Sequence, residues 1–156
     1  MPGKKIATSI NTGTTSSSHA ISLKARVLLI NEGRILLLKQ TKLNGGNYTL
    51  IGGRVENHEM VKESLVREVL EEAGIVIKKG QLHLVHTLYK KRKIGGRIVL
   101  YFECEKYRGV PKNMEPDKFK SVSWHHLDSL PTPMSPTVQH VLKMIEKGVP
   151  YSEISL

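Results

Sequence analysis

The sequence lacks the features that mark several classes of protein. Its 156 residues include one cysteine, Cys104, which excludes an internal disulfide and a metal site built from several cysteines. No apolar run approaches the roughly 18–20 residues that a membrane-spanning helix needs, and the N-terminus lacks the apolar stretch of a secretory signal. These absences favour a cytoplasmic protein without membrane association.

Acidic residues are scarce relative to basic ones. The chain has 24 lysines and arginines against 14 aspartates and glutamates, a formal net charge of +10. Such an excess favours polyanionic partners, either the phosphates of a nucleotide or a nucleic acid. A surface that is rich in lysine only for solubility has the same composition, so composition leaves both interpretations open.

The order of the predicted elements indicates a single mixed α/β domain. Residues 1–18 are rich in serine, threonine and glycine and predict a flexible N-terminal segment, followed by one domain over residues 19–150 and a C-terminal tail over 151–156. The expected strands cover residues 26–30, 34–38, 48–51, 81–89, 97–105 and 120–125, and the expected helices residues 60–73 and 136–147. Strands on both sides of a central helix are typical of an α/β domain.

Three glutamates gather on one face of the helix predicted over residues 60–73. Glu68 neighbours both Glu71 and Glu72 at the i,i+3 and i,i+4 spacings, where like charges cost a helix about 0.2–0.5 kcal/mol per pair. Helix stability therefore gives no reason for the cluster, whereas Mg²⁺ does, because it takes carboxylate oxygens as ligands. The alternative is an acidic helix face that simply meets solvent.

The residues around this cluster form a longer pattern. Gly52-Gly53 precedes the helix and lets the backbone approach a ligand closely, while Gly74 ends it. In G-x5-E-x7-R-E-U-x-E-E-x-G-U, where U is apolar, all nine specified positions are filled, by Gly53, Glu59, Arg67, Glu68, Val69, Glu71, Glu72, Gly74 and Ile75. The chain thereby resembles the Nudix (MutT-like) hydrolases, over roughly residues 21–148.

The resemblance implies a fold and a chemistry. The fold is an α/β/α sandwich around a mixed β-sheet, and the chemistry is hydrolysis of a nucleoside diphosphate linked to another moiety, with Mg²⁺ or Mn²⁺ as cofactor. Glu68, Glu71 and Glu72 are then the catalytic residues. Glu71 and Glu72 are expected to be metal ligands, Glu68 a ligand or the general base, and the carbonyl oxygen of Gly52 a further ligand.

Other positions of the pattern are expected to hold the loop and helix together. In the family Glu59 and Arg67 have this role, with Gly53 and Gly74 as backbone positions, although Glu63 is an alternative partner for Arg67 along the helix. Two positions depart from the family: His58 stands where glycine is common, and Met60 where serine or threonine is common. The usual first-turn cap is then missing, and Asn57 could cap an earlier start.

Outside the pattern the resemblance names fewer residues. Lys39 and Arg54 are placed like phosphate-contacting residues of the family, and each could equally be an ordinary cation facing solvent. The segment Glu115-Pro116-Asp117-Lys118 resembles the Glu-Pro-x-Lys segment of Nudix diphosphatases that clear nucleoside triphosphates. Glu115 is therefore expected to add a carboxylate to the metal site, with an acidic turn residue as the alternative.

A run of cations, Lys90-Lys91-Arg92-Lys93, lies in the turn expected over residues 90–96. It could lie along an RNA backbone. A solvated turn also accounts for it, because the interleaved aromatic residues of RNA-binding surfaces are missing.

Three functional hypotheses follow. The first is a Mg²⁺-dependent enzyme that converts a nucleoside triphosphate to the monophosphate and pyrophosphate, or applies the same chemistry to a dinucleoside polyphosphate, a nucleotide sugar or the 5′ end of RNA. The second is a Nudix scaffold that binds nucleotide or RNA without catalysis, and the third is a basic nucleic-acid-binding domain. A nucleotide is the expected partner, with RNA and a second copy of the chain, as a homodimer, as further candidates.

Overall fold

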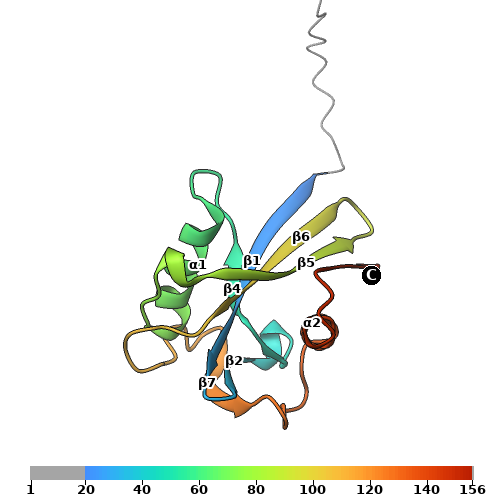
Figure 1. Ribbon diagram of the computed structural model, residues 1–156. Coiled ribbons are helices and arrows are strands. Elements are labelled where there is room, and N and C mark those ends of the chain that lie inside the picture. The colour runs from blue at the N-terminus through green and yellow to red at the C-terminus, as the bar shows by residue number, and fades with distance from the viewer. Residues whose placement is uncertain (1–19, 156) are drawn as a thin grey trace, which may run out of the picture.

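The computed structural model describes residues 20–155, so the N-terminal segment predicted over residues 1–18 lies outside the described residues. The chain alternates strands with two helices (Figure 1). In chain order the elements are β1 (Ile21–Asn31), β2 (Arg34–Gln40), η1 (Lys42–Asn44), β3 (Tyr48–Thr49), β4 (Ile51–Arg54), α1 (Val61–Ala73), η2 (Lys79–Gln81), β5 (His83–Lys91), β6 (Gly96–Cys104), β7 (Phe119–His126), α2 (Pro136–Glu146) and β8 (Tyr151–Ser155).

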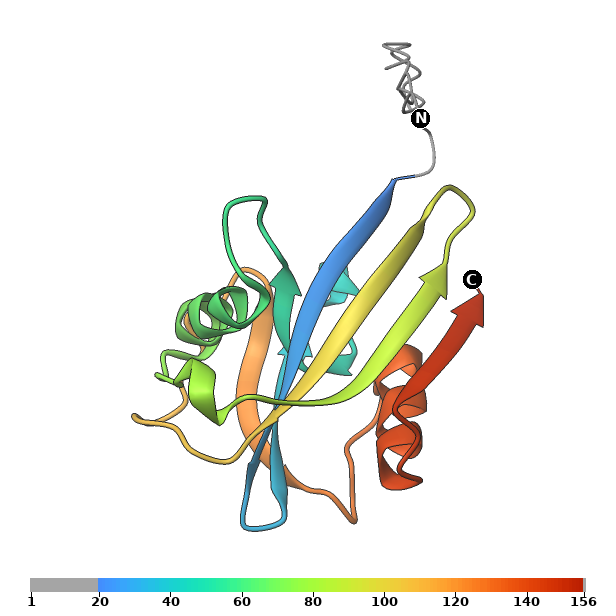
Figure 2. The ribbon, with the colours of Figure 1, turned by 45° about the horizontal axis from the view of Figure 1, so that its top comes forward.

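The long strand β1 connects the two parts of a mixed sheet. Along one edge it pairs parallel with β6, and along the other it pairs antiparallel first with β4 and then, at its end, with β2. The strand order is β3-β2-β1-β6-β5-β8, with β7 on β2 and β4 on β1. Figure 2 shows β1, β6, β5 and β8 side by side. Since β4 pairs only with β1, the strand that leads into α1 lies where the sheet divides.

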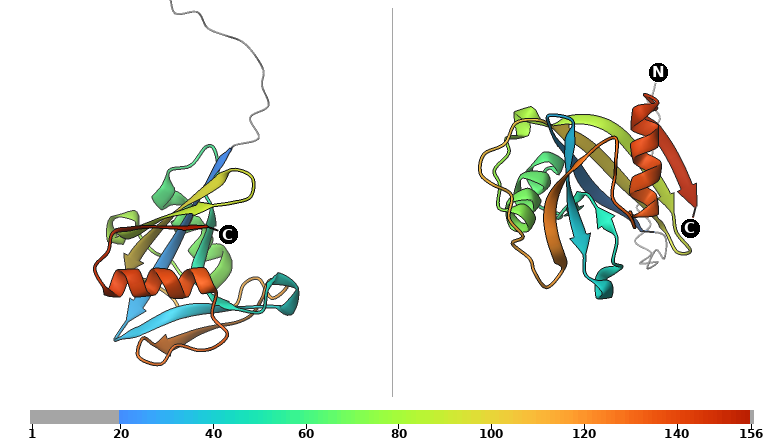
Figure 3. Two further views of the ribbon diagram at one scale, coloured as in Figure 1. Left: turned by 90° about the vertical axis from the view of Figure 1, so that its right-hand side faces the viewer. Right: turned by 90° about the horizontal axis from the view of Figure 1, so that it is seen from below.

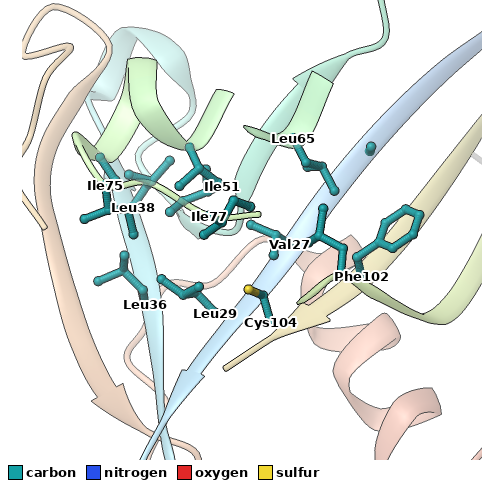
Figure 4. Packing of buried hydrophobic residues seen from close by; sticks show 14 of the residues in the cluster. Val27, Leu29, Leu36, Leu38, Ile51, Leu65, Ile75, Ile77, Phe102 and Cys104 are labelled. Atoms are coloured by element: carbon teal, nitrogen blue, oxygen red, sulfur yellow. The ribbon is translucent and has the colours of Figure 1, made fainter. Parts of the chain in front are cut away.

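The two helices cover opposite faces of this sheet (Figure 3). Alternating residues of β1 explain the arrangement, because Ala25, Val27 and Leu29 belong to the core cluster under α1, while Leu28 belongs to the cluster under α2. Leu65 extends from α1 into the first cluster (Figure 4). Val69 and Ala73 also belong to that cluster, and Val138 and Val141 fill the second from α2. The predicted α/β/α sandwich around a mixed sheet is confirmed.

Several boundaries differ from the sequence predictions. The strand predicted over residues 48–51 is two strands, because Tyr48-Thr49 pairs with β2 whereas Ile51–Arg54 pairs with β1. The turn predicted over residues 90–96 is shorter, since Lys90 and Lys91 pair with β6 and only Arg92 to Gly95 forms the turn.

The C-terminal tail predicted over residues 151–156 is also wrong for residues 151–155, which form β8 and pair parallel with β5. The buried His86 explains why this segment is ordered: its Nε2 lies 2.8 Å from the Ser152 hydroxyl, and its Nδ1 lies 2.8 Å from the Val149 carbonyl oxygen. Ile154 packs against the core cluster under α2. A short polar segment of this kind carries too few apolar residues for periodicity to reveal it.

A hydrogen bond between a glutamate side chain and the backbone caps the start of α1. The helix begins at Val61 with Met60 as its N-cap residue, so Asn57 does not cap an earlier start. The Glu63 carboxylate accepts a 3.1 Å hydrogen bond from the Met60 backbone N–H and so occupies a donor that the helix itself leaves free.

Among residues 20–155, neither helix combines the length and apolarity required to span a bilayer.

The contribution of α1 to stability can be measured at Leu65, whose side chain is fully buried. We expect Leu65→Ala to lower the free energy of unfolding by about 2–5 kcal/mol, because it leaves a cavity between helix and sheet. Leu43→Ala is the matched control, since Leu43 is 99% exposed. Equal urea midpoints for the two variants would contradict the packing described here.

Candidate active site

Helix α1 places its three glutamates in different environments. Glu72 is 6% exposed and lies against the sheet, the Glu68 side chain is 14% exposed, and the Glu71 side chain is 47% exposed. The helix therefore does not present a uniform acidic face to solvent. The Glu72 carboxylate is buried, that of Glu68 is mostly buried, and that of Glu71 is exposed.

The two glycines in the middle of β4 bring its backbone close to β1 and to these carboxylates. A Cβ added to Gly53 would meet the Glu68 carboxylate, and one added to Gly52 would collide with the Ala25 carbonyl oxygen of β1. Gly52 also has a φ of +146°, which side chains rarely adopt. Its N–H donates a long, 3.4 Å hydrogen bond to Glu72 Oε2. The pairing of β4 with β1 therefore requires glycine at position 52.

Burial makes the Glu72 carboxylate hard to ionise. Desolvation, followed by hydrogen bonding to Glu68 and the negative charge of Glu68, raises the pKa of Glu72 well above its ordinary value. The nearby Arg26 guanidinium and the Gly52 N–H oppose this shift. A bound cation would lower the electrostatic cost of ionising both carboxyl groups.

Arg67 ties the loop before α1 to the helix. Its guanidinium donates to both oxygens of Glu59, at 2.8 and 3.1 Å, and Glu59 Oε1 also accepts the Glu56 N–H. The same guanidinium contacts Glu68 at 3.1 Å and Glu71 at 3.2 Å. Glu63, the alternative partner predicted for Arg67, instead lies 3.5 Å from Lys79. Arg67 thus fixes two of the three glutamates and anchors the loop.

Glu115 comes from a distant part of the chain. The Met114 N–H donates to the Glu72 carbonyl oxygen at 3.2 Å, so this loop lies at the end of α1. Glu115 Oε2 is buried and forms an ion pair with Lys118 Nζ at 3.1 Å. The carboxylate of Glu115 raises the pKa of Lys118, and the charges of Glu72 and Glu68 add to this effect. The predicted acidic segment therefore lies beside the helix cluster.

The two predicted phosphate-contacting residues differ in position. Arg54 is exposed at the end of β4, next to the glycine pair, and its carbonyl oxygen accepts a hydrogen bond from Arg67 at 3.4 Å. Lys39 donates to the Gly46 carbonyl oxygen at 2.7 Å and lies 4.5 Å from the centroid of the Tyr48 ring. Lys39 thus contacts the loop after β2, and its predicted phosphate contact stays a prediction.

Sequence reasoning missed Arg26. Its backbone is opposite Gly52 in the β1–β4 pair, and its Nη1 donates to the Leu50 carbonyl oxygen at 2.8 Å. Within the predicted strand over residues 26–30 nothing marks this arginine as functional, because the register of β1 against β4 is a property of the folded sheet.

The donors at this site suit a hard dication. Glu68, Glu72 and Glu115 carry carboxylate oxygens, the ligand type that Mg²⁺ and Mn²⁺ prefer. The Gly52 carbonyl oxygen is the further ligand that the sequence predicts. Within residues 20–155 no three acidic, histidine or cysteine side chains already converge on one point, so the fit rests on the donor chemistry of these residues.

Comparisons with known proteins agree with this geometry. Residues 22–145 match the family described as NUDIX domain, so the chain belongs to the Nudix family and is a Nudix hydrolase. It is 29% identical to the uncharacterized Nudix hydrolase YvcI of Bacillus subtilis over 125 residues, which cover 78% of this chain and 77% of that protein.

Two other relatives have names that describe an activity. The NAD-capped RNA hydrolase NudC of Photorhabdus laumondii is 30% identical over 64% of this chain, which spans only 37% of that protein. The oxidized purine nucleoside triphosphate hydrolase of Danio rerio is 29% identical over 67% of this chain and 66% of its own length. Among solved structures, the MutT NUDIX hydrolase of Burkholderia pseudomallei superposes with a TM-score of 0.72 at 25% identity, covering 80% of this chain and 98% of its own.

The Glu59–Arg67 ion pair predicts how stability depends on pH. Hydrogen bonding to Arg67 lowers the pKa of Glu59 from 4.5 to about 2. The pair therefore stabilises the fold fully above pH 4.5, and its contribution is lost as the pH falls toward 2. We expect Glu59→Gln to cost about 1–2 kcal/mol at pH 7, a modest value because Arg67 is partly exposed.

Denaturant unfolding at several pH values between 7 and 3 measures this loss. The difference between wild type and Glu59→Gln should shrink with acidity. Glu56→Gln is the matched control in the same loop, because the Glu56 side chain forms no ion pair within the described part of the chain. A Glu59→Gln penalty that stays constant with pH would show that the ion pair does not hold the loop.

Proposed function

We propose that this Nudix hydrolase is a Mg²⁺- or Mn²⁺-dependent diphosphohydrolase that cleaves nucleoside triphosphates to the monophosphate and pyrophosphate. The observation that carries the proposal is the packing of the Glu72 and Glu68 carboxylates against the Gly52-Gly53 backbone. This packing places two carboxyl groups together in a desolvated site, where burial and Glu68 oppose the ionisation of Glu72. A bound dication would favour the ionised form of both groups.

Glu68, Glu72, Glu115 and the Gly52 carbonyl are the proposed ligands of the dication, and Glu71 is a further ligand on the exposed side. The chemistry that such an ion supplies is neutralisation of the diphosphate charge and acidification of a water molecule. Gly53 allows the substrate phosphates to approach the backbone without a Cβ in the way. Arg54, exposed beside the glycines, is placed to contact a phosphate.

The remaining charges orient the glutamates. Arg67 holds Glu68 and Glu71 by ion pairs of 3.1 and 3.2 Å and so limits their rotamers before substrate binds. As the alternative to binding the ion, Glu68 is proposed as the general base, because its side chain is 14% exposed and a water molecule can reach it. Arg26 supplies positive charge on the other side of Glu72.

The substrate class is supported by two observations. Glu115 and Lys118, from the Glu-Pro-x-Lys segment, lie beside the glutamate cluster, and one relative is named as a hydrolase of oxidized purine nucleoside triphosphates. The 5′ end of RNA is the second candidate, because several relatives are named as NAD-capped RNA hydrolases.

A cytoplasmic setting is part of the proposal and is supported by the free thiol of the buried Cys104.

The decisive variant is Glu72→Gln, which keeps the shape of the side chain and removes its charge. We expect kcat/KM for nucleoside triphosphates with Mg²⁺ to fall at least about 100-fold, since even indirect partners of metal ligands are worth 10–100-fold. Mn²⁺ binding, followed by electron paramagnetic resonance, should weaken in parallel. Unchanged turnover and unchanged Mn²⁺ binding would reject the role of this carboxylate.

Two controls separate chemistry from folding. Without added metal, Glu72→Gln should be at least as stable as wild type and increasingly so as the pH rises above 4.5, because a raised pKa means that ionisation of Glu72 opposes folding. Glu146→Gln removes a carboxylate from α2, where Glu146 is exposed, and should leave activity and Mn²⁺ binding at wild-type values.

A further inference from the structure

A second charged site lies on the face of the sheet that α2 covers. A cavity of about 100 Å³ opens between β1, β5, β6 and the first turn of α2. We call it the basic pocket and define it by Lys24, Arg26, Lys90 and Arg97, all of which are half-buried. The other polar groups that line it are the side chains of Thr49, Tyr101, Ser135 and Thr137.

None of these four cations has an acidic partner among residues 20–155, where all five ion pairs involve other residues. Their hydrogen bonds go to neutral oxygens instead. Lys90 donates to the Thr137 hydroxyl at 2.8 Å and Arg97 to the Ser22 hydroxyl at 3.1 Å. The pocket therefore concentrates positive charge that the described fold does not neutralise.

The crowding of these cations lowers the pKa values of two of them. Burial, and then the neighbouring charges of Arg26 and Arg97, lower the pKa of Lys24 to about 8. Burial and Arg97 likewise lower the pKa of Lys90. Half-buried cations are ordinarily paired with acids, so their accumulation here is better explained by an anionic ligand than by stability.

Helix α2 adds to the positive potential. Ser135 and Thr137, which begin the helix, line the pocket, so the positive end of its dipole is directed there. The first turn of α2 contains no acidic residue, although an acid at that position would ordinarily stabilise the helix. Both the side chains and the helix favour an anion.

Strand β1 connects the basic pocket to the candidate active site. Lys24 and Arg26, which line the pocket, are opposite Arg54 and Gly52 in the β1–β4 pair. The Arg26 charge acts on Glu72 as well as on Lys24 and Lys90. A ligand in the basic pocket therefore lies on the strand that neighbours the Gly52-Gly53 backbone.

We propose that the basic pocket binds a second phosphate group of the substrate, carried on the nucleoside side of the diphosphate that is cleaved. This inference rests on the proposed function and names its substrate class: a nucleoside 5′-triphosphate that also bears a phosphate on its 3′ oxygen. That chemistry occurs in a free 3′-phosphorylated nucleotide and in the first internucleotide phosphate of an RNA 5′ end.

The size and lining of the basic pocket favour a phosphate over a whole nucleoside. Pockets for organic ligands commonly measure about 300–1,000 Å³, whereas this cavity measures about 100 Å³. Its lining contains no carboxylate that would repel an anion. Lysine and arginine instead match phosphate oxygens.

The first experiment measures binding without turnover. Isothermal titration calorimetry compares adenosine and guanosine 5′-monophosphates with the corresponding 3′,5′-bisphosphates. We expect the 3′-phosphate to tighten binding about tenfold, the effect of one charge-assisted hydrogen bond. Equal affinities would overturn the inference whether or not the protein hydrolyses nucleotides, so its failure is distinct from failure of the proposed function.

The second experiment compares kcat/KM for three substrates: a nucleoside 5′-triphosphate, the same compound with a 3′-phosphate, and a 5′-triphosphate dinucleotide. A gain of about tenfold with the 3′-phosphate supports the pocket. If the dinucleotide matches or exceeds this gain, the source is an RNA end; if it does not, the source is a free nucleotide. No gain with either phosphorylated compound overturns the inference.

Variants assign the effect to the pocket. Lys24→Gln and Arg97→Gln should each reduce the preference for the 3′-phosphate to less than about threefold, because each removes one contact to the anion. Lys147→Gln is the matched control, since Lys147 is exposed at the opposite end of α2. Thermal unfolding of each variant verifies folding. A preference that survives both pocket substitutions, or falls equally with Lys147→Gln, would contradict the assignment.

Discussion

The structure depends on a buried carboxylate held against a glycine backbone. Glu72 lies almost completely inside the protein, close to Glu68 and to the Gly52 N–H. Two acids in a desolvated site repel each other, so the surrounding fold must hold them there. Helix α1 does this through its packed face of Leu65, Val69 and Ala73, and Arg67 secures the exposed side. The apolar core thus offsets an electrostatic cost that protonation of Glu72, or a bound cation, relieves.

The side chains of strand β1 contribute to both faces of the sheet. Its odd-numbered residues form the core under α1, and Lys24 and Arg26 line the basic pocket under α2. Pairing with β4 places this strand directly beside the glycine pair. One strand therefore contributes packing to the carboxylate site and cations to the neighbouring pocket. A larger, mostly apolar cavity of about 600 Å³ lies further along α2 near Leu130 and Ile145, and none of its lining residues lines the basic pocket.

Local sequence was sufficient for much of this description. The fold class, the two helices and the strands predicted over residues 26–30 and 34–38 follow from periodicity. The structure joins these strands by a turn at Glu32-Gly33, where both residues have positive φ. The gathering of Glu68 and Glu72 follows from helical spacing. Arg26 and the basic pocket could not be predicted, because they depend on the register of β1 against β4 and on the contact of α2 with the sheet. The contact of the Lys39 amine with the Gly46 carbonyl oxygen likewise depends on the folded loop.

The most direct measurement is a crystal structure of the protein with Mn²⁺ and a non-hydrolysable nucleoside triphosphate, with the ion located by anomalous scattering. The account predicts an anomalous peak bounded by the carboxylates of Glu68 and Glu72 and the Gly52 carbonyl, with the triphosphate beside it. A nucleotide bound elsewhere, with these carboxylates turned toward solvent and no peak between them, would contradict it.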